Sequence, residues 1–166
     1  MSNPTNSSEA LPSDILSWTG GRALVATGSP FDPVVHDDGR LISIGQVNNV
    51  LIFPGLGLGA ILCEVAEVTD DMFAAAADQL AAEATAEDLA SGTVLPPVRR
   101  IRAVTARIAA AVVRSAQAAG VARRVIPDDQ IDASLAAAMW EPVYLPTVPA
   151  APIESTVAAG AAARNA

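Results

Sequence analysis

The chain contains no lysine, because all ten of its basic residues are arginine. Within these 166 residues this excludes a lysine general base, a lysine Schiff base and the lysine of a Walker phosphate loop. The chain also has a single cysteine, Cys63, so no intrachain disulfide can form. One cysteine and no secretory pattern in the first residues predict a reducing, cytoplasmic location.

Aromatic residues make up only 4% of the sequence, so we expect a core of alanine, valine, leucine and isoleucine. An apolar content of 51% favours a folded protein, and 166 residues suffice for one domain. The longest apolar run, Val50–Cys63, is broken by Pro54 and several glycines and falls short of the ~20 residues of a membrane span. The net charge of -8 opposes binding to nucleic acid or to an anionic membrane. We therefore expect neither kind of partner.

The first fifty residues predict little regular structure. Glycine and proline bound one apolar run that is typical of a buried strand, and Asp38-Gly39 favours a hairpin turn. The expected elements are a helix over Pro12–Trp18, a buried strand over Ala23–Thr27, a hairpin of Val34–Asp37 and Arg40–Ile44, and a polar loop over Gly45–Asn49.

The remainder predicts helices. Ile101, Val104, Ile108 and Val112 repeat at three and four residues, which indicates one apolar helix face, and Gly120 is typical of a helix end. The expected helices are Pro54–Val65, buried on most sides, one capped by Thr69 that ends near Glu83, a short one capped by Thr85, then Arg99–Ala119, and Pro127–Met139. Residues 1–145 are predicted to form one domain, and residues 146–166 a disordered tail rich in alanine and proline.

The run Gly55-Leu56-Gly57-Leu58-Gly59-Ala60 resembles a dinucleotide loop but does not match one. Its third glycine falls one position early for G-x-G-x-x-G, and no strand ending in an acidic residue follows about 20 residues later. We interpret the small residues as allowing close helix packing.

Few side chains suggest catalysis or metal binding. His36 is the only histidine and is predicted to lie exposed beside the hairpin turn, and Cys63 is predicted to lie in the core. The carboxylates of Asp70, Asp71, Asp128 and Asp129 are expected in first helical turns, where the helix dipole accounts for them. No metal site is predicted.

Asn48-Asn49 precede a predicted buried helix, and two amides there can hold a polar ligand or can form a turn and helix cap. Residue chemistry leaves both interpretations open.

Several stretches together resemble the malic enzyme family, from Ser2 to about Tyr144. They are Ser2-Asn3-Pro4-Thr5, Gly21-Arg22-Ala23-Leu24-Val25-Ala26-Thr27-Gly28-Ser29-Pro30-Phe31, Gly45-Gln46-Val47-Asn48-Asn49-Val50, Ile52-Phe53-Pro54-Gly55, Thr69-Asp70-Asp71-Met72-Phe73, Asp88-Leu89-Ala90-Ser91-Gly92, Leu95-Pro96-Pro97 and Met139-Trp140-Glu141-Pro142.

The resemblance implies a reaction and a set of ligands. The family oxidatively decarboxylates malate to pyruvate and CO₂ with NAD or NADP and a divalent metal, Mg²⁺ or Mn²⁺. By resemblance, Asn3, Asn48 and Asn49 would contact malate, and Asn3 and Asn48 would also border the nicotinamide. Val47 stands where the family has glycine, which predicts a displaced or strained loop.

The resemblance also implies what is missing. The family's catalytic tyrosine and lysine, its acidic metal ligands and its phosphate loop lie in a part that we do not find here. Tyr144 corresponds to the family's C-terminal extension and is not the catalytic tyrosine. We therefore expect no catalytic residue and no metal ligand in this chain.

Together these observations predict an α/β fold. We expect an incomplete Rossmann-like NAD-binding domain, mostly helical, with one buried strand and a β-hairpin. The expected function is that of a malic enzyme fragment that is inactive alone. The alternatives are one chain of a split enzyme, whose partner would be the missing N-terminal half, and a non-catalytic interaction module. Because Ala23–Thr27 would lack parallel neighbours, the chain is also predicted to be marginally stable, oligomeric or prone to aggregation.

Overall fold

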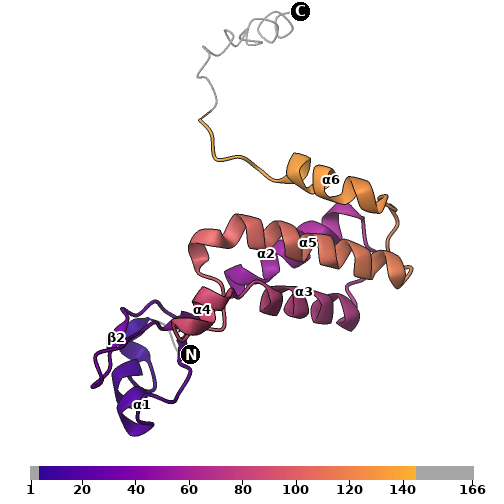
Figure 1. The fold of residues 1–166 in the computed structure, drawn as a ribbon. Coiled ribbons are helices and arrows are strands. Elements are labelled where there is room, and N and C mark those ends of the chain that lie inside the picture. The colour runs from indigo at the N-terminus through magenta and orange to yellow at the C-terminus, as the bar shows by residue number, and fades with distance from the viewer. Residues whose placement is uncertain (1–3, 145–166) are drawn as a thin grey trace, which may run out of the picture.

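The computed structural model describes residues 4–144 of the chain. The predicted tail over residues 146–166 and the candidate site residue Asn3 lie outside these residues. Figure 1 shows two regions that follow one another along the chain: a small region with the strands near the N-terminus, and a layered group of helices. We call them the strand region and the helical region. Helix α4 lies where the two regions meet.

The strand region holds helix α1 (Pro12–Trp18) and four strands of two residues each. The strands are β1 (Ala26–Thr27), β2 (Val34–Val35), β3 (Leu41–Ile42) and β4 (Gly45–Gln46). The pair β2–β3 is antiparallel and closes the predicted hairpin, with Val34 opposite Ile42. The pair β1–β4 is parallel, with Ala26 opposite Gly45.

The parallel pair corrects two predictions. The segment Gly45–Asn49 was expected to be a loop, but Gly45 and Gln46 form β4 beside β1. The apolar run Ala23–Thr27 is a strand only at its last two residues, and Leu24 is exposed. The expectation that this strand has no parallel neighbour is therefore wrong for one of its two edges.

A small apolar cluster supports the strand region. Leu16 of α1, Val25 before β1 and Ile42 of β3 are buried together, and Ala23 and Val34 pack against them. Burial of these side chains fixes α1 across the strands.

The helical region contains helix α2 (Phe53–Leu62), α3 (Asp70–Ala82), α4 (Ala86–Ala90), α5 (Ile101–Ala118) and α6 (Ile131–Ala138). Short 3₁₀ turns lie at Thr5–Ser7 in the strand region and at Asn49–Leu51, Val98–Arg100 and Asp128–Gln130 in the helical region. The chain is thus mostly helical in the described residues, with a parallel pair and a hairpin, as predicted.

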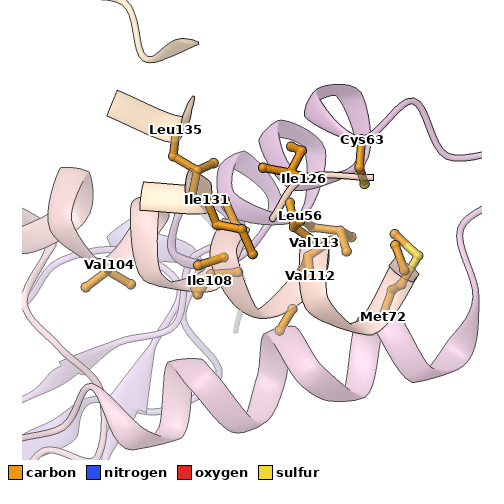
Figure 2. Close-up of a cluster of buried hydrophobic side chains, with 14 residues drawn as sticks. Leu56, Cys63, Met72, Val104, Ile108, Val112, Val113, Ile126, Ile131 and Leu135 are labelled. Carbon is orange, nitrogen blue, oxygen red and sulfur yellow. The ribbon is translucent and has the colours of Figure 1, made fainter. Parts of the chain in front are cut away.

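Helix α5 is the centre of this region, and Figure 2 shows its apolar side chains meeting those of α2, α3 and α6. The predicted stripe is confirmed, since Val104, Ile108 and Val112 are fully buried while Ile101 is half-buried. Met72 of α3 and Leu135 of α6 are buried against the same core.

The helix ends match the predictions unevenly. Thr85 and Asp88 form a reciprocal capping box at the start of α4. Gly120 follows α5 with a φ of +71°, which only glycine adopts without strain. Thr69 stands at the start of α3, but its side chain accepts no capping bond. Thr69 therefore occupies the predicted position, but the predicted hydrogen bond to its side chain is absent.

The predicted close packing of α2 is confirmed at two of its glycines. A Cβ on Gly55 would lie 2.6 Å from side-chain atoms of Ile108, and one on Gly59 would lie 2.7 Å from the Ala109 carbonyl oxygen. The opposite face of α2 differs from the prediction, because Phe53 and Ile61 are exposed. Among residues 4–144, no helix is long and apolar enough to cross a membrane.

Candidate functional site

The carboxyl ends of β1 and β4 lie side by side. The Gly45 N–H donates to the Val25 carbonyl oxygen at 3.0 Å, and the Val47 N–H donates to the Thr27 carbonyl oxygen at 2.8 Å. The turn after Thr27 and the Asn48-Asn49 loop after β4 therefore emerge at the same edge. In open sheets with parallel strands, ligands bind at this edge.

Thr27 stabilises this edge. The sequence alone predicted no individual role for this residue. Its side chain is buried, and its hydroxyl donates to the Ser29 carbonyl oxygen at 2.8 Å. The same residue accepts the Val47 N–H through its backbone. Thr27 thus holds the turn on one strand and the start of the asparagine loop on the other. The available signal was a threonine ending an apolar run before Gly28-Ser29.

Asn48 adopts the helix-cap role that the sequence left open. It has an extended backbone with φ of -135°, and its Oδ1 accepts the Val50 N–H at 3.0 Å at the start of the turn Asn49–Leu51. The side chains of Asn48 and Asn49 are exposed. The side-chain oxygen of Asn48 is therefore already hydrogen-bonded. The side-chain nitrogen of Asn48 has no hydrogen-bond partner within the described residues.

Val47 does not strain the loop. Glu64 is the non-glycine residue with positive φ in the described chain, so Val47 has an ordinary backbone conformation. Its N–H extends the parallel ladder to Thr27. The predicted strain at this position is therefore wrong, because Val47 continues β4 and needs no glycine conformation.

Two cavities border β1 and β4. One of about 170 Å³ lies between Ser8–Ala10 and Val25–Gly28, beside the carboxyl end of β1. A second, of about 360 Å³, lies between the β4 side and the connector that precedes α5, and is lined by Phe31, Gln46 and Arg99 among others. Asn48 and Asn49 line neither of them.

His36 is less exposed than predicted. Its side chain is only 15% exposed, because the imidazole lies against Gly21, where a Cβ would come within 2.7 Å of Nε2. Its Nδ1 is 3.2 Å from Asp38 Oδ1. Hydrogen bonds from the backbone and side chain of Arg40 lower the pKa of Asp38 to about 2. The histidine therefore helps to seat the hairpin on the turn after α1.

The acidic residues form no metal centre in the described part of the chain. Within residues 4–144, no group of three or more histidine, cysteine, aspartate or glutamate residues is placed to hold a metal ion. Asp70 and Asp71 lie in the first turn of α3, as predicted. Asp128 and Asp129 begin the turn before α6, and Asp128 pairs with Arg114 at 2.6 Å.

The glycine run and the cysteine are structural. Gly55 and Gly59 face α5, so the backbone of α2 offers no free concave surface there for a pyrophosphate. Cys63 is fully buried, its Sγ donates to the Gly59 carbonyl oxygen at 3.0 Å, and burial raises the pKa of its thiol. Both predictions of a packing role are confirmed.

The chain resembles known proteins over most of its length. A sequence profile described as "Malic enzyme, NAD binding domain" matches residues 1–117. The chain is 46% identical over 144 residues to an NAD-dependent malic enzyme of Vibrio parahaemolyticus, and the alignment covers 87% of this chain and 25% of that protein. It is 47% identical over 146 residues to NAD-dependent malic enzyme 3 of Bacillus subtilis, covering 88% and 25% of the two chains.

A third relative, an NAD-dependent malic enzyme of Pseudomonas syringae, is 44% identical over 144 residues, with 87% of this chain and 25% of the relative covered. The chain thus spans about a quarter of the length of the curated relatives that it matches. Because the profile covers most of the chain, the chain belongs to the malic enzyme family and corresponds to part of its NAD-binding domain.

Proposed function

We propose that this chain provides part of an NAD-dependent malic enzyme and does not catalyse the reaction alone. In that reaction malate is oxidised and decarboxylated to pyruvate and CO₂ while a nicotinamide cofactor accepts the hydride. The chain's own contribution is a set of uncharged amides, Asn3, Asn48 and Asn49, that hold malate beside the nicotinamide.

The main support for this proposal is the position of the loop that contains Asn48 and Asn49. Asn48 and Asn49 follow β4, at the edge where the carboxyl ends of two parallel strands meet. Both side chains are exposed there and free of the core. The chain also covers part of a family profile whose description names NAD binding.

The capping bond defines what Asn48 can recognise. Its Oδ1 is engaged by the Val50 N–H, so the amide nitrogen is the group left to meet a ligand. An amide N–H donates, so the matching ligand group is an acceptor. A malate carboxylate and the carbonyl oxygen of nicotinamide both satisfy this requirement. A neutral donor also adds no negative charge next to the dicarboxylate.

Asn3 is included by resemblance alone, because it lies outside the described residues. The segment Ser8–Ala10, which follows it closely in sequence, lines the cavity beside Val25–Gly28. Ser8–Ala10 therefore lie near the carboxyl end of β1.

The remaining chemistry must come from residues outside this chain. The chain has no lysine, so it cannot supply a lysine base. The donor set of residues 4–144 does not fit a Mg²⁺ or Mn²⁺ site, because no three potential ligands gather at one place. Gly55 and Gly59 of α2 pack on α5, so they are not free to hold the cofactor's phosphates. The relatives' names support NAD over NADP.

Two measurements test the proposal. The purified chain should give no malate-dependent reduction of NAD. A chimera in which the chain replaces the matching segment of the Bacillus subtilis malic enzyme 3 should be active, because the two are 47% identical there. Turnover by the chain alone, or a folded chimera that binds neither malate nor NAD, would contradict the proposal.

Variants of Asn48 in this chimera separate its two roles. Asn48→Asp and Asn48→Ser retain an oxygen that can accept the Val50 N–H, but both lose the amide donor. If the donor binds malate, both variants should lower kcat/KM by about 10- to 100-fold, the effect of one hydrogen bond to a charged group. If Asn48 acts only as a cap, both should retain activity and Asn48→Ala alone should lose it.

The alternative roles predict other results. Turnover that appears only when the chain is mixed with a separate protein carrying the rest of the enzyme would make it one chain of a split malic enzyme. Binding to an intact malic enzyme without added turnover would make it a non-catalytic module. We also propose that residues 1–145 form one domain and that the protein is cytoplasmic, as the lone buried Cys63 suggests.

A further inference from the structure

We propose that the cavity of about 360 Å³ beside β4 binds a free α-amino acid with an apolar side chain. Its lining comes from three segments that are separate in sequence: Pro30–Phe31, Ser43–Gln46, and residues between Glu87 and Arg99. Asn48 and Asn49 line no part of it, so the proposal does not depend on the proposed function.

Backbone contacts fix two of these walls against each other. The Ser43 N–H donates to the Ser91 carbonyl oxygen at 2.8 Å, which ties the segment before β4 to the residues after α4. Gly45 lies so close to Thr93 that an added Cβ would come within 2.9 Å of the Thr93 hydroxyl oxygen. The cavity is therefore already formed in the chain, as is usual for a small-molecule site.

Four polar side chains line this cavity without a partner. They are Ser43, Gln46, Glu87 and Arg99, and none of them forms a side-chain hydrogen bond or ion pair within residues 4–144. Ser43 and Gln46 are also half-buried. A polar group that is partly withdrawn from water without a partner costs free energy, which a ligand that pairs with it recovers.

The charges in the lining favour a zwitterion. The carboxylate of Asp88 is already neutralised, because it pairs with Arg100 and caps α4 through Thr85. Among the described lining residues this leaves Glu87 and Arg99 as the charged groups without an ion pair. A simple anion would be repelled by Glu87 and a simple cation by Arg99. An amino acid instead offers its carboxylate to the guanidinium and its ammonium group to the carboxylate.

The rest of the lining favours an apolar side chain on that amino acid. Phe31 and Leu95 are half-buried, and Pro96 is buried. An aliphatic or aromatic side chain placed against them would be removed from water. The volume of about 360 Å³ lies near the lower end of the range of about 300–1,000 Å³ for small-molecule pockets, which suits a ligand of this size.

The first test is calorimetric titration of the full chain with leucine, glycine, N-acetyl-leucine and leucinamide. We expect leucine to bind and glycine to bind more weakly, because glycine has no side chain to bury. N-acetyl-leucine lacks the ammonium group and leucinamide lacks the carboxylate, so each should lose about 10-fold or more in affinity. No binding of leucine, or equal binding of leucine and both derivatives, would overturn the proposal.

The second test assigns each charge of the ligand to one residue. Arg99→Gln should weaken leucine by about 10-fold or more but leave leucinamide unchanged, and Glu87→Gln should weaken leucine but leave N-acetyl-leucine unchanged. Arg123→Gln is the matched control, because Arg123 is exposed and lies outside the lining. The unfolding transition of each variant shows that the fold is intact. Unchanged leucine affinity in both folded lining variants, or an equal loss in the control, would overturn the proposal.

Discussion

The two regions of the molecule differ in how completely they are packed. In the helical region, α5 is surrounded by α2, α3 and α6, and Ile108 and Val112 are fully buried. In the strand region, the core consists of Leu16, Val25 and Ile42, and each strand is two residues long. A two-stranded parallel pair has little stability of its own. The Asn48-Asn49 loop therefore starts in the weaker region and ends in the stronger one.

The largest expected difference between the regions comes from truncating one isoleucine in each. Ile108→Ala should lower the free energy of unfolding by about 4 kcal/mol, because it leaves a cavity between α5 and α2. Ile42→Ala should instead open β1 and β4 locally and leave the main transition nearly unchanged. Chemical denaturation followed by circular dichroism measures the first effect, and amide hydrogen exchange at Val47 measures the second.

The comparison would fail if both variants lowered one shared transition by similar amounts. The two regions would then unfold as a single cooperative unit, and the small core of the strand region would be coupled to α5.

A second prediction tests whether α2 is closely packed on one side only. Gly59→Ala should cost about 3 kcal/mol, because the new methyl would collide with the Ala109 carbonyl oxygen at 2.7 Å and with Val112. Gly57→Ala on the outer face should raise stability by about 1 kcal/mol, because alanine favours a helix and the space is open. Thermal unfolding at low protein concentration compares the two. If both substitutions changed the stability equally, the description of α2 as packed on α5 through its Gly59 face and open at Gly57 would be wrong.

A third prediction compares an ion pair in each region. Glu83 at the end of α3 is buried, and both of its oxygens accept hydrogen bonds from Arg107 of α5, which lowers the pKa of the carboxyl group. Glu83→Gln should cost about 2 kcal/mol at neutral pH, because it weakens two charge-assisted bonds. Asp38 and Arg40 on the hairpin are exposed, so Asp38→Asn should have a smaller effect on unfolding.

The pH dependence of this third effect has a definite sign. Because the pKa of Glu83 is lower in the folded state, its stabilisation is complete above the ordinary carboxyl pKa and is lost as the pH falls below it, through the lowered value. The difference in stability between the native chain and Glu83→Gln should therefore shrink in acid. A difference that stays constant down to low pH would contradict the role given to the ionised carboxylate.

The helices could be predicted from sequence because their signals are local. Pro12 and Gly20 bound α1, the stripe from Val104 to Val112 identifies α5, and Thr85 identifies the start of α4. Strand β4 could not be predicted, since Gly45 has no side chain and Gln46 is polar, so neither shows an alternating pattern. Its strand conformation depends on hydrogen bonds to Val25 and Thr27, which are distant in sequence.

The candidate site was predicted only through resemblance. Residue chemistry left Asn48 as either a cap or a ligand, and the structure shows the cap while leaving its amide nitrogen available. The supporting role of Thr27 and the partial burial of His36 against Gly21 both depend on contacts between separate segments, which spacing alone does not reveal.

Cys63 can report on the opening of the helical region. It is the only thiol in the chain, it is fully buried, and its hydrogen bond to the Gly59 carbonyl ties it to the end of α2. A thiol-specific reagent can reach it only when the packing around the carboxyl end of α2 opens. The rate of labelling therefore measures the opening of this core in native conditions, without a denaturant and without an engineered cysteine. The same labelling rate would show whether the rest of the enzyme, when it is present, slows the opening of that core.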